Sequence, residues 1–146
     1  MRISYPVFFF SRKEKKQIQE AIQEAEKNTS GEVRVHLDHK CRGSVYGHAQ
    51  KVFHRIGMTK TAQRNGVLIY LATRDKKFAV LGDVGINEKV PVGFWNDVVL
   101  IMTEYFKQNK FAEGISKAAV RIGEKLKAYF PHQANDKNEL ADGISY

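Results

Sequence analysis

The sequence has little of what would tie it to a membrane or an oxidising compartment. Its single cysteine, Cys41, excludes an internal disulfide, and apolar runs such as residues 7–10 are far shorter than a membrane-spanning helix of roughly 18 residues. The same run lacks the length and the small-residue cleavage site of a signal peptide. We therefore expect a cytoplasmic protein without a membrane anchor.

Charge of one sign is not concentrated anywhere in the chain. Twenty-four basic and 16 acidic residues give a net charge of +8, yet no block of five like charges occurs. The densest basic stretch, residues 12–16, opens a predicted helix whose later turns carry glutamates, which is typical of a solvated helix face. A weak electrostatic nucleic-acid binder is therefore a hypothesis that rests on net charge alone. No RNA-binding signature, zinc-finger spacing or leucine-zipper heptad favours it, and we expect no nucleic-acid partner.

The chain does contain a regular succession of helix and strand patterns. It reads as a single domain over 1–146, with a core at 11–130 and a polar tail at 131–146. Strands are predicted over 32–38, 66–72 and 78–81, the last two forming a hairpin, and helices over 12–27, 45–56, from Pro91, and over 111–126. This predicts the α/β class, as a three-layer α/β/α sandwich with a small mixed central sheet of about four strands. Residues 7–10 fit either an edge strand or a packing staple for the first helix.

Polar loops converge on one edge of this predicted sheet. A strand, helix, strand crossover makes the first two strands parallel, and the hairpin reverses the third. The starts of the first and second strands therefore lie beside the end of the third, and the tail with Asp136 and Glu139 can reach the same edge. This edge collects most of the loop carboxylates of a basic protein, which is the best functional indication in the sequence.

The oxygen-bearing side chains at this edge suggest a site for a hard cation. Calcium takes carboxylate, amide and backbone carbonyl oxygens, and the glycine-rich loop after the third strand carries several of them. We predict a divalent metal site, for Ca²⁺ or Mg²⁺, that orders residues 83–90 against the neighbouring loop. The alternative is that Asp83 and Asn87 only cap turns and a helix start. The candidate ligands are Asp83, Asn87, Glu88, Glu32, Asn65 and, less securely, Asp97.

Three short runs resemble a known family in combination. They are Thr29-Ser30-Gly31-Glu32-Val33-Arg34-Val35, Arg64-Asn65-Gly66-Val67-Leu68-Ile69 and Gly82-Asp83-Val84-Gly85-Ile86, which look like the TPM domain family. The resemblance covers the chain from the first helix to about Phe130. It implies an α/β/α sandwich, divalent-cation binding in some members and phosphatase activity in a plant member. Many members carry a signal peptide and a membrane anchor, whereas this chain resembles a stand-alone soluble version.

Two other chemistries remain open for these residues. Metal-assisted hydrolysis of phosphomonoesters, an acid phosphatase reaction, would use the same loop, with Asp83 as ligand or nucleophile and Arg64 as a phosphate partner. A soft-metal site would use His39 and Cys41, but four-ligand spacing is absent. We expect a regulatory or interaction domain with an unidentified protein partner, and an enzyme only in the phosphatase alternative.

Overall fold

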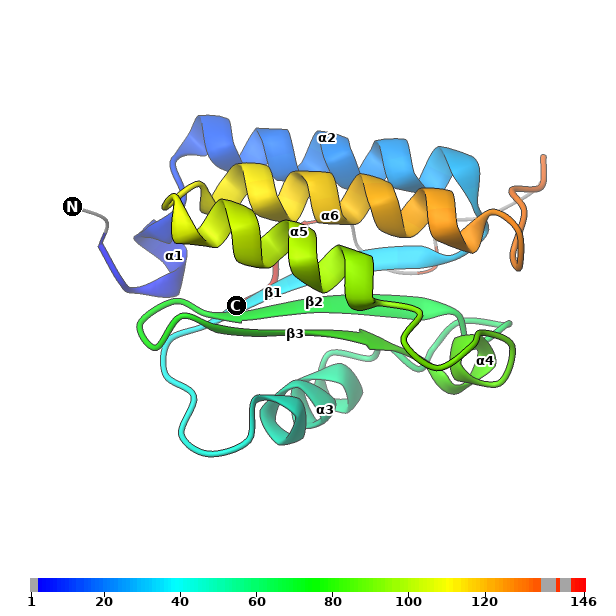
Figure 1. Ribbon diagram of the computed structural model, residues 1–146, viewed down its shortest axis with the longest axis horizontal. Coiled ribbons are helices and arrows are strands. Elements are labelled where there is room, and N and C mark those ends of the chain that lie inside the picture. The colour runs from blue at the N-terminus through cyan, green and yellow to red at the C-terminus, as the bar shows by residue number, and fades with distance from the viewer. Residues whose placement is uncertain (1–2, 135–138, 140–142) are drawn as a thin grey trace.

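The sheet has three strands and mixed direction. The computed structural model describes residues 3–134, 139 and 143–146, and its strand order is β1-β2-β3 (Figure 1). Strand β1 (Glu32–Asp38) pairs in parallel with β2 (Gly66–Ala72), and β2 pairs antiparallel with β3 (Lys77–Gly82). The predicted crossover and hairpin are therefore confirmed.

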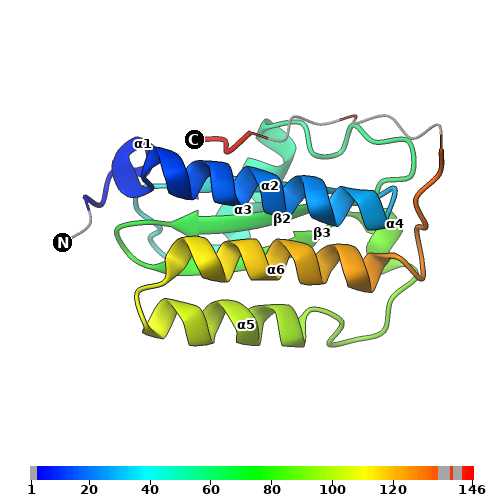
Figure 2. The same cartoon turned by 90° about the horizontal axis from the view of Figure 1, so that it is seen from above.

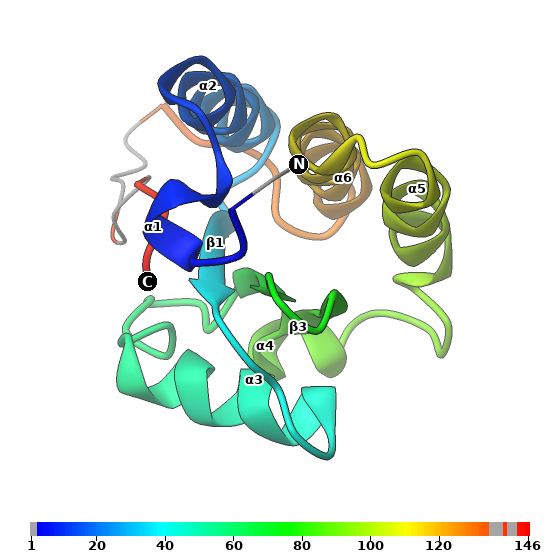
Figure 3. The same ribbon diagram turned by 90° about the vertical axis from the view of Figure 1, so that its left-hand side faces the viewer.

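Helices cover both faces of this sheet. Three long helices lie over one face, side by side when seen from above, and α3 lies over the opposite face (Figures 1, 2 and 3). A short N-terminal helix, α1, packs at one end of the sheet, and the single turn α4 follows β3 at the other end (Figure 1). The helices are α1 (Pro6–Phe9), α2 (Arg12–Asn28), α3 (Val45–Arg55), α4 (Val84–Asn87), α5 (Asn96–Lys107) and α6 (Phe111–Leu126).

The sheet separates two clusters of buried side chains. Successive side chains of a strand point to opposite faces, so each strand contributes to both clusters. Val33, Val67 and Val80 belong to the larger cluster under α2, α5 and α6, whereas Leu68 and Tyr70 belong to the smaller cluster against α3. This alternation also decides on which side of the sheet each polar residue at its edge lies.

The expected strand count was wrong, because the described residues form three strands and not about four. Residues 7–10 do not form the additional edge strand that they fitted, because residues 7–9 lie in the short helix α1 and Phe10 is its C-cap. Pro6 in its first turn favours this outcome, since proline has a fixed φ suited to a helix start and has no amide hydrogen to contribute to a sheet. Residues 36 and 145 form only an isolated bridge along the edge of β1.

Local capping interactions fix the ends of two helices. Ser11 and Glu14 form a capping box at the start of α2, with hydrogen bonds of 3.0 and 3.1 Å. Gly57, after α3, adopts a φ of 79°, which a side chain would disfavour. Among the described residues, no helix combines the length and the apolar character needed to cross a bilayer.

Candidate functional site

Backbone hydrogen bonds join the three predicted segments at one edge of the sheet. The Glu32 amide donates to the Asn65 carbonyl at 3.3 Å, and the Asp83 amide donates to the Gly66 carbonyl at 3.0 Å. The Gly85 amide donates to the Arg64 carbonyl at 2.9 Å, which attaches the loop after β3 to the loop before β2. The sequence therefore predicted correctly which loops meet.

Two carboxylates of this edge lie on the same face of the sheet, on either side of a glycine. Glu32 is the β1 partner of Gly66, and Asp83 lies across Gly66 on the other side. By the strand alternation, both side chains lie on the face that packs against α3. Two strand spacings put their Cα atoms about 10 Å apart, and Gly66 has no side chain between them. Glu32 is only 3% exposed and Asp83 only 4%.

Asp83 is held by an arginine. The Arg64 Nε and Nη2 atoms donate to the two Asp83 carboxylate oxygens at 2.7 and 2.9 Å, and the Val84 amide donates to Asp83 Oδ1 at 2.7 Å. The hydrogen bonds to Asp83 raise the pKa of the Arg64 guanidinium above its usual value. The Arg64 backbone has a φ of 50°, in the left-handed region. The sequence analysis missed this ion pair, because it treated Arg64 only as a phosphate partner.

Asn65 lies on the opposite face. Its side-chain Nδ2 donates to the Ser30 hydroxyl at 3.4 Å, and its backbone N–H donates to Thr61 Oγ1 at 3.1 Å. Its Oδ1 is buried and has no hydrogen-bond partner among the described residues. The alternation therefore separates Asn65 from the carboxylate pair, although all three residues lie at the same edge.

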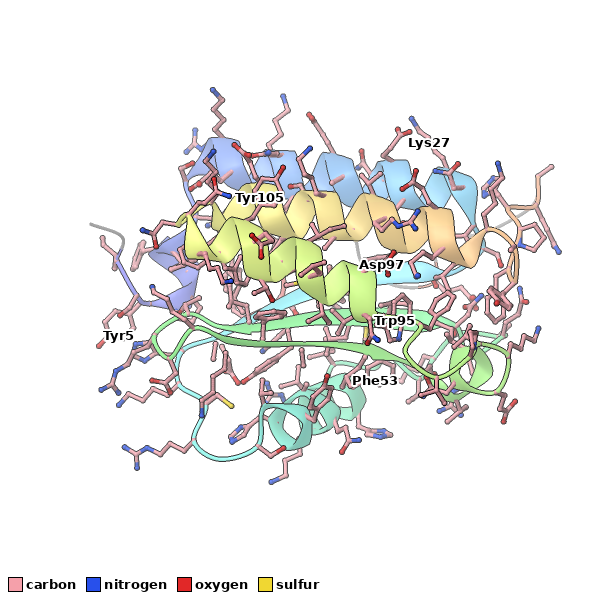
Figure 4. The ribbon with its side chains drawn as sticks, in the orientation of Figure 1. Tyr5, Lys27, Phe53, Trp95, Asp97 and Tyr105 are labelled. Carbon is pink, nitrogen blue, oxygen red and sulfur yellow. The ribbon has the colours of Figure 1, made fainter. Side chains whose placement is uncertain are left out.

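The remaining candidates occupy other positions. Asn87 and Glu88 are exposed, in and just after α4, where Asn87 Nδ2 donates to the Gly82 carbonyl at 3.1 Å. Asp97, in the first turn of α5 (Figure 4), pairs with Arg121 and Lys125, each at 2.8 Å. The structure thus places Asp97 in an ion-pair network with α6 and not beside the loop after β3.

The tail does reach the site edge. The Glu139 carboxylate accepts a hydrogen bond from the Ala62 amide at 3.1 Å, in the loop before β2. Asp136, the other acidic residue expected there, lies outside the described residues.

The residues expected for a soft metal do not assemble. His39 stacks on Tyr5 at a ring-centroid distance of 4.4 Å, and Cys41 is buried. Within the described ranges, no group of three or more His, Cys, Asp or Glu side chains could hold a metal ion. A cation at the site edge would therefore depend on the two carboxylates together with amide, carbonyl or water oxygens.

A cavity of about 580 Å³ opens beside Asp83. It lies between α3, the end of β3 and α4. Its lining combines Asp83 and Arg64 with Lys51 and His54 of α3, and with the apolar side chains of Phe53, Leu81 and Val84. The cavity therefore brings positive side chains to the acidic edge of the sheet.

Comparisons with known proteins agree with this fold. The solution structure of the BA42 protein from Bizionia argentinensis is 42% identical, with a TM-score of 0.88 and 94% of each chain covered. The solution structure of an N-terminal domain from P. gingivalis is 16% identical, with a TM-score of 0.67 and coverage of 86% of this chain and 83% of that one. The N-terminal domain of the cg2496 protein from Corynebacterium glutamicum is 15% identical, with a TM-score of 0.63 and coverage of 79% and 72%.

Curated proteins gave no match. The family model described as "TPM domain" matches residues 7–125, which is most of the chain and contains α2, the whole sheet and the loops of the candidate site. This chain belongs to the TPM domain family.

Proposed function

We propose that the chain binds a divalent cation, Ca²⁺ or Mg²⁺, between Glu32 and Asp83. The observation that carries the proposal is the pair of buried carboxylates on one face, on either side of Gly66. Carboxylate oxygens are the ligands that hard divalent cations prefer. A cation between the two would reach both sets of oxygens, because metal–oxygen distances of roughly 2.0–2.6 Å and two side-chain lengths fit the spacing of about 10 Å.

Two carboxylates supply only part of a coordination shell. Mg²⁺ is commonly bound through one or two carboxylates and keeps several waters, whereas Ca²⁺ takes six to eight oxygens. The exposed Asn87 amide, backbone carbonyls of the loop before β2 and water would complete the shell. Asn65, in that loop, and Glu139, which accepts from the Ala62 amide of the loop, would not contact the cation directly.

Arg64 occupies the position from which a cation would act on Asp83. Its side chain is 43% exposed, so the guanidinium can move from the carboxylate toward solvent. Cation binding would then exchange one positive partner of Asp83 for another. Since the Arg64 carbonyl accepts the Gly85 amide, the exchange would also order the loop after β3 against residues 58–65 and change a surface that a protein partner could recognise.

Calorimetric titration with CaCl₂ and with MgCl₂ tests this proposal. The wild type is expected to bind one ion per chain, and Glu32→Gln and Asp83→Asn should each weaken binding by about tenfold or more, because a neutral amide replaces a charged ligand. Asp97→Asn is the matched control and should bind like the wild type. Wild-type affinity in Glu32→Gln, with the fold intact by circular dichroism, would refute the site.

The adjoining cavity supports a second candidate, metal-assisted hydrolysis of a phosphomonoester. Arg64, Lys51 and His54 line it next to Asp83, and such side chains pair with phosphate oxygens. A bound cation would polarise the phosphoryl group or lower the pKa of a bound water. Hydrolysis of para-nitrophenyl phosphate that needs Mg²⁺ and is lost in Asp83→Asn would support this function; no turnover with saturating Mg²⁺ would exclude it for this substrate.

A further inference from the structure

The N-terminal segment carries an exposed apolar patch that the candidate site does not use. We call its four residues, Ile3, Tyr5, Val7 and Phe8, the N-terminal patch. Their exposed fractions are 59%, 60%, 50% and 68%. Large apolar side chains that gather within six residues and remain exposed are typical of an interaction surface, whereas single exposed ones are ordinary.

The N-terminal patch is fixed to the body of the protein. The Tyr5 ring stacks on His39, the Ser4 carbonyl accepts a hydrogen bond from the Thr73 hydroxyl, and Lys15 Nζ donates to the Val7 carbonyl at 2.9 Å. Phe9, which follows the N-terminal patch in the sequence, is buried, and its ring centroid lies 5.3 Å from that of Phe111. The fold therefore presents these apolar side chains outward at a defined position, and Figure 4 shows Tyr5 projecting at the end of the molecule.

Basic residues are frequent in the segments next to the N-terminal patch. His39, which stacks on Tyr5, lies in the loop after β1, and Thr73, which donates to the Ser4 carbonyl, lies in the turn between β2 and β3. Lys76 Nζ, in the same turn, lies 5.6 Å from the centroid of the Phe9 ring. Figure 3 shows this end of the molecule, where α1 lies beside the end of β1 and the start of α2. We call the following set, drawn from these neighbouring segments, the basic rim: Arg12, Lys13, Lys15, Lys40, Arg74 and Lys76.

The carboxylates of the same segments are engaged in local hydrogen bonds. Asp38 accepts the Tyr70 hydroxyl at 2.8 Å, Asp75 accepts the Cys41 amide at 2.8 Å, and Glu14 belongs to the capping box. The Cys41 amide lowers the pKa of Asp75, which keeps that carboxylate ionised and bonded to the backbone. Of the basic rim, Lys15 Nζ donates to the Val7 carbonyl, and Lys76 Nζ lies 5.6 and 5.0 Å from the ring centroids of Phe9 and Phe111.

We propose that this end of the protein docks on the surface of an anionic phospholipid bilayer, with the N-terminal patch in the headgroup region and the basic rim against the lipid phosphates. Tyrosine, phenylalanine and aliphatic side chains prefer that region, and nearby lysines and arginines are attracted by anionic lipids. A nucleic acid would neutralise the basic rim but would leave the N-terminal patch in water. A second copy of this chain would oppose one basic rim to another, in a protein of net charge +8.

This orientation leaves the candidate cation site accessible. Helix α4 and the loop after β3 lie at the opposite end of the sheet from α1 (Figure 1). Docking through α1 would therefore point the edge with Asp83 away from the bilayer, so the two sites would act independently.

Vesicle co-sedimentation tests the docking proposal. The full chain is mixed with phosphatidylcholine vesicles that contain either no phosphatidylserine or about one third phosphatidylserine, at low and high salt. The wild type should bind the anionic vesicles at least about tenfold more tightly than the neutral ones, and less tightly at high salt. The double variant Tyr5→Ser/Phe8→Ser should lose at least about tenfold in affinity for the anionic vesicles.

Two further variants separate the contributions. Val92→Ser removes a fully exposed apolar side chain far along the chain from the N-terminal patch and should bind like the wild type. Lys40→Glu/Arg74→Glu reverses two exposed charges of the basic rim and should also lose anionic-vesicle binding. Because this second pair leaves the patch unchanged, it tests the proposal even if Tyr5→Ser/Phe8→Ser does not fold.

Three results would overturn the proposal. The first is no binding of the wild type to anionic vesicles. The second is binding to both vesicles and duplex DNA that Tyr5→Ser/Phe8→Ser leaves unchanged, which would indicate charge alone. The third is a dimer by light scattering that the same double variant dissociates, which would assign the N-terminal patch to a second copy of the chain.

Discussion

At the residue scale, Asp83 has two candidate positive partners, one within the chain and one in solution. The bidentate pair with Arg64 holds a buried carboxylate, but the Arg64 side chain is half-exposed. Solvent screens the exposed part of such a pair, so its contribution is smaller than that of a fully buried pair. If a cation binds, it must compete with Arg64.

Replacement of Arg64 should show whether the guanidinium and a cation compete for Asp83. Without a cation, Arg64→Gln should destabilise the fold, because Asp83 stays buried and loses its ion pair. Its affinity for Ca²⁺ or Mg²⁺ should nevertheless rise, by about three- to tenfold, because a competing positive charge is gone. Thermal unfolding and calorimetric titration measure the two effects.

Arg121→Gln is the control, since Arg121 pairs with Asp97 at 2.8 Å outside the site. It should leave cation affinity unchanged. An Arg64→Gln protein that binds cations more weakly than the wild type would mean that the guanidinium helps the site and does not compete with it.

The burial of His36 predicts how the free energy of unfolding depends on pH. Its ring is buried and hydrogen-bonded to the Ser145 hydroxyl at 2.7 Å, and burial lowers its pKa from 6.5 to about 4, helped by Arg55 and Arg34 and opposed by Asp38. Between these two values the unfolded chain binds a proton that the folded chain does not. The stabilisation is therefore complete above pH 6.5 and is lost as the pH falls toward 4, by at most about 3 kcal/mol.

Urea unfolding at pH 7 and pH 4.5 measures this loss. His36→Gln should show a smaller difference between the two pH values, whereas the exposed-residue control His54→Gln should keep the wild-type difference. An unchanged pH dependence in His36→Gln would assign the loss to other groups.

At the scale of elements, α2 and α6 pack closely at one glycine. A Cβ atom on Gly123 would lie 2.6 Å from both the Cα and the carbonyl oxygen of Ala25, so the backbones would have to separate. Gly123→Ala should therefore destabilise the fold by about 1–3 kcal/mol. Gly47→Ala, in α3, is the control, because its Cβ would meet Ser44 at 3.6 Å. It should be neutral or stabilising by up to about 1 kcal/mol. Equal stability of the two variants by urea unfolding would contradict this packing.

Helices and strands whose apolar residues recur at a regular spacing were predicted well. The apolar faces of α2 and α6 and the alternation in β1 follow from spacing alone. The helix expected from Pro91 begins only at Asn96, because residues 91–95 form turns that pack Phe94 and Trp95 against the core. Helix α4 is a single turn capped by Asp83, and a turn this short leaves no periodic pattern to detect.

At the scale of the whole molecule, topology predicted which loops meet but not which side chains face one another. Parallel pairing and the hairpin bring Glu32, Asn65 and Asp83 to one edge, and the structure agrees. Their faces depend on the exact register, which pairs Glu32 with Gly66 and leaves Asn65 on the other side. The ion pair of Asp83 with Arg64 depends on a backbone with φ of 50°, which the sequence does not specify.

The most direct test of the central claim is a calcium titration of the ¹⁵N-labelled chain followed by amide NMR. A cation between Glu32 and Asp83 should shift residues 83–88, 58–66 and 32 together, with one saturating curve, and these shifts should be absent in Glu32→Gln. Shifts confined to His39 and Cys41, or no saturable shift at millimolar Ca²⁺ or Mg²⁺, would contradict it.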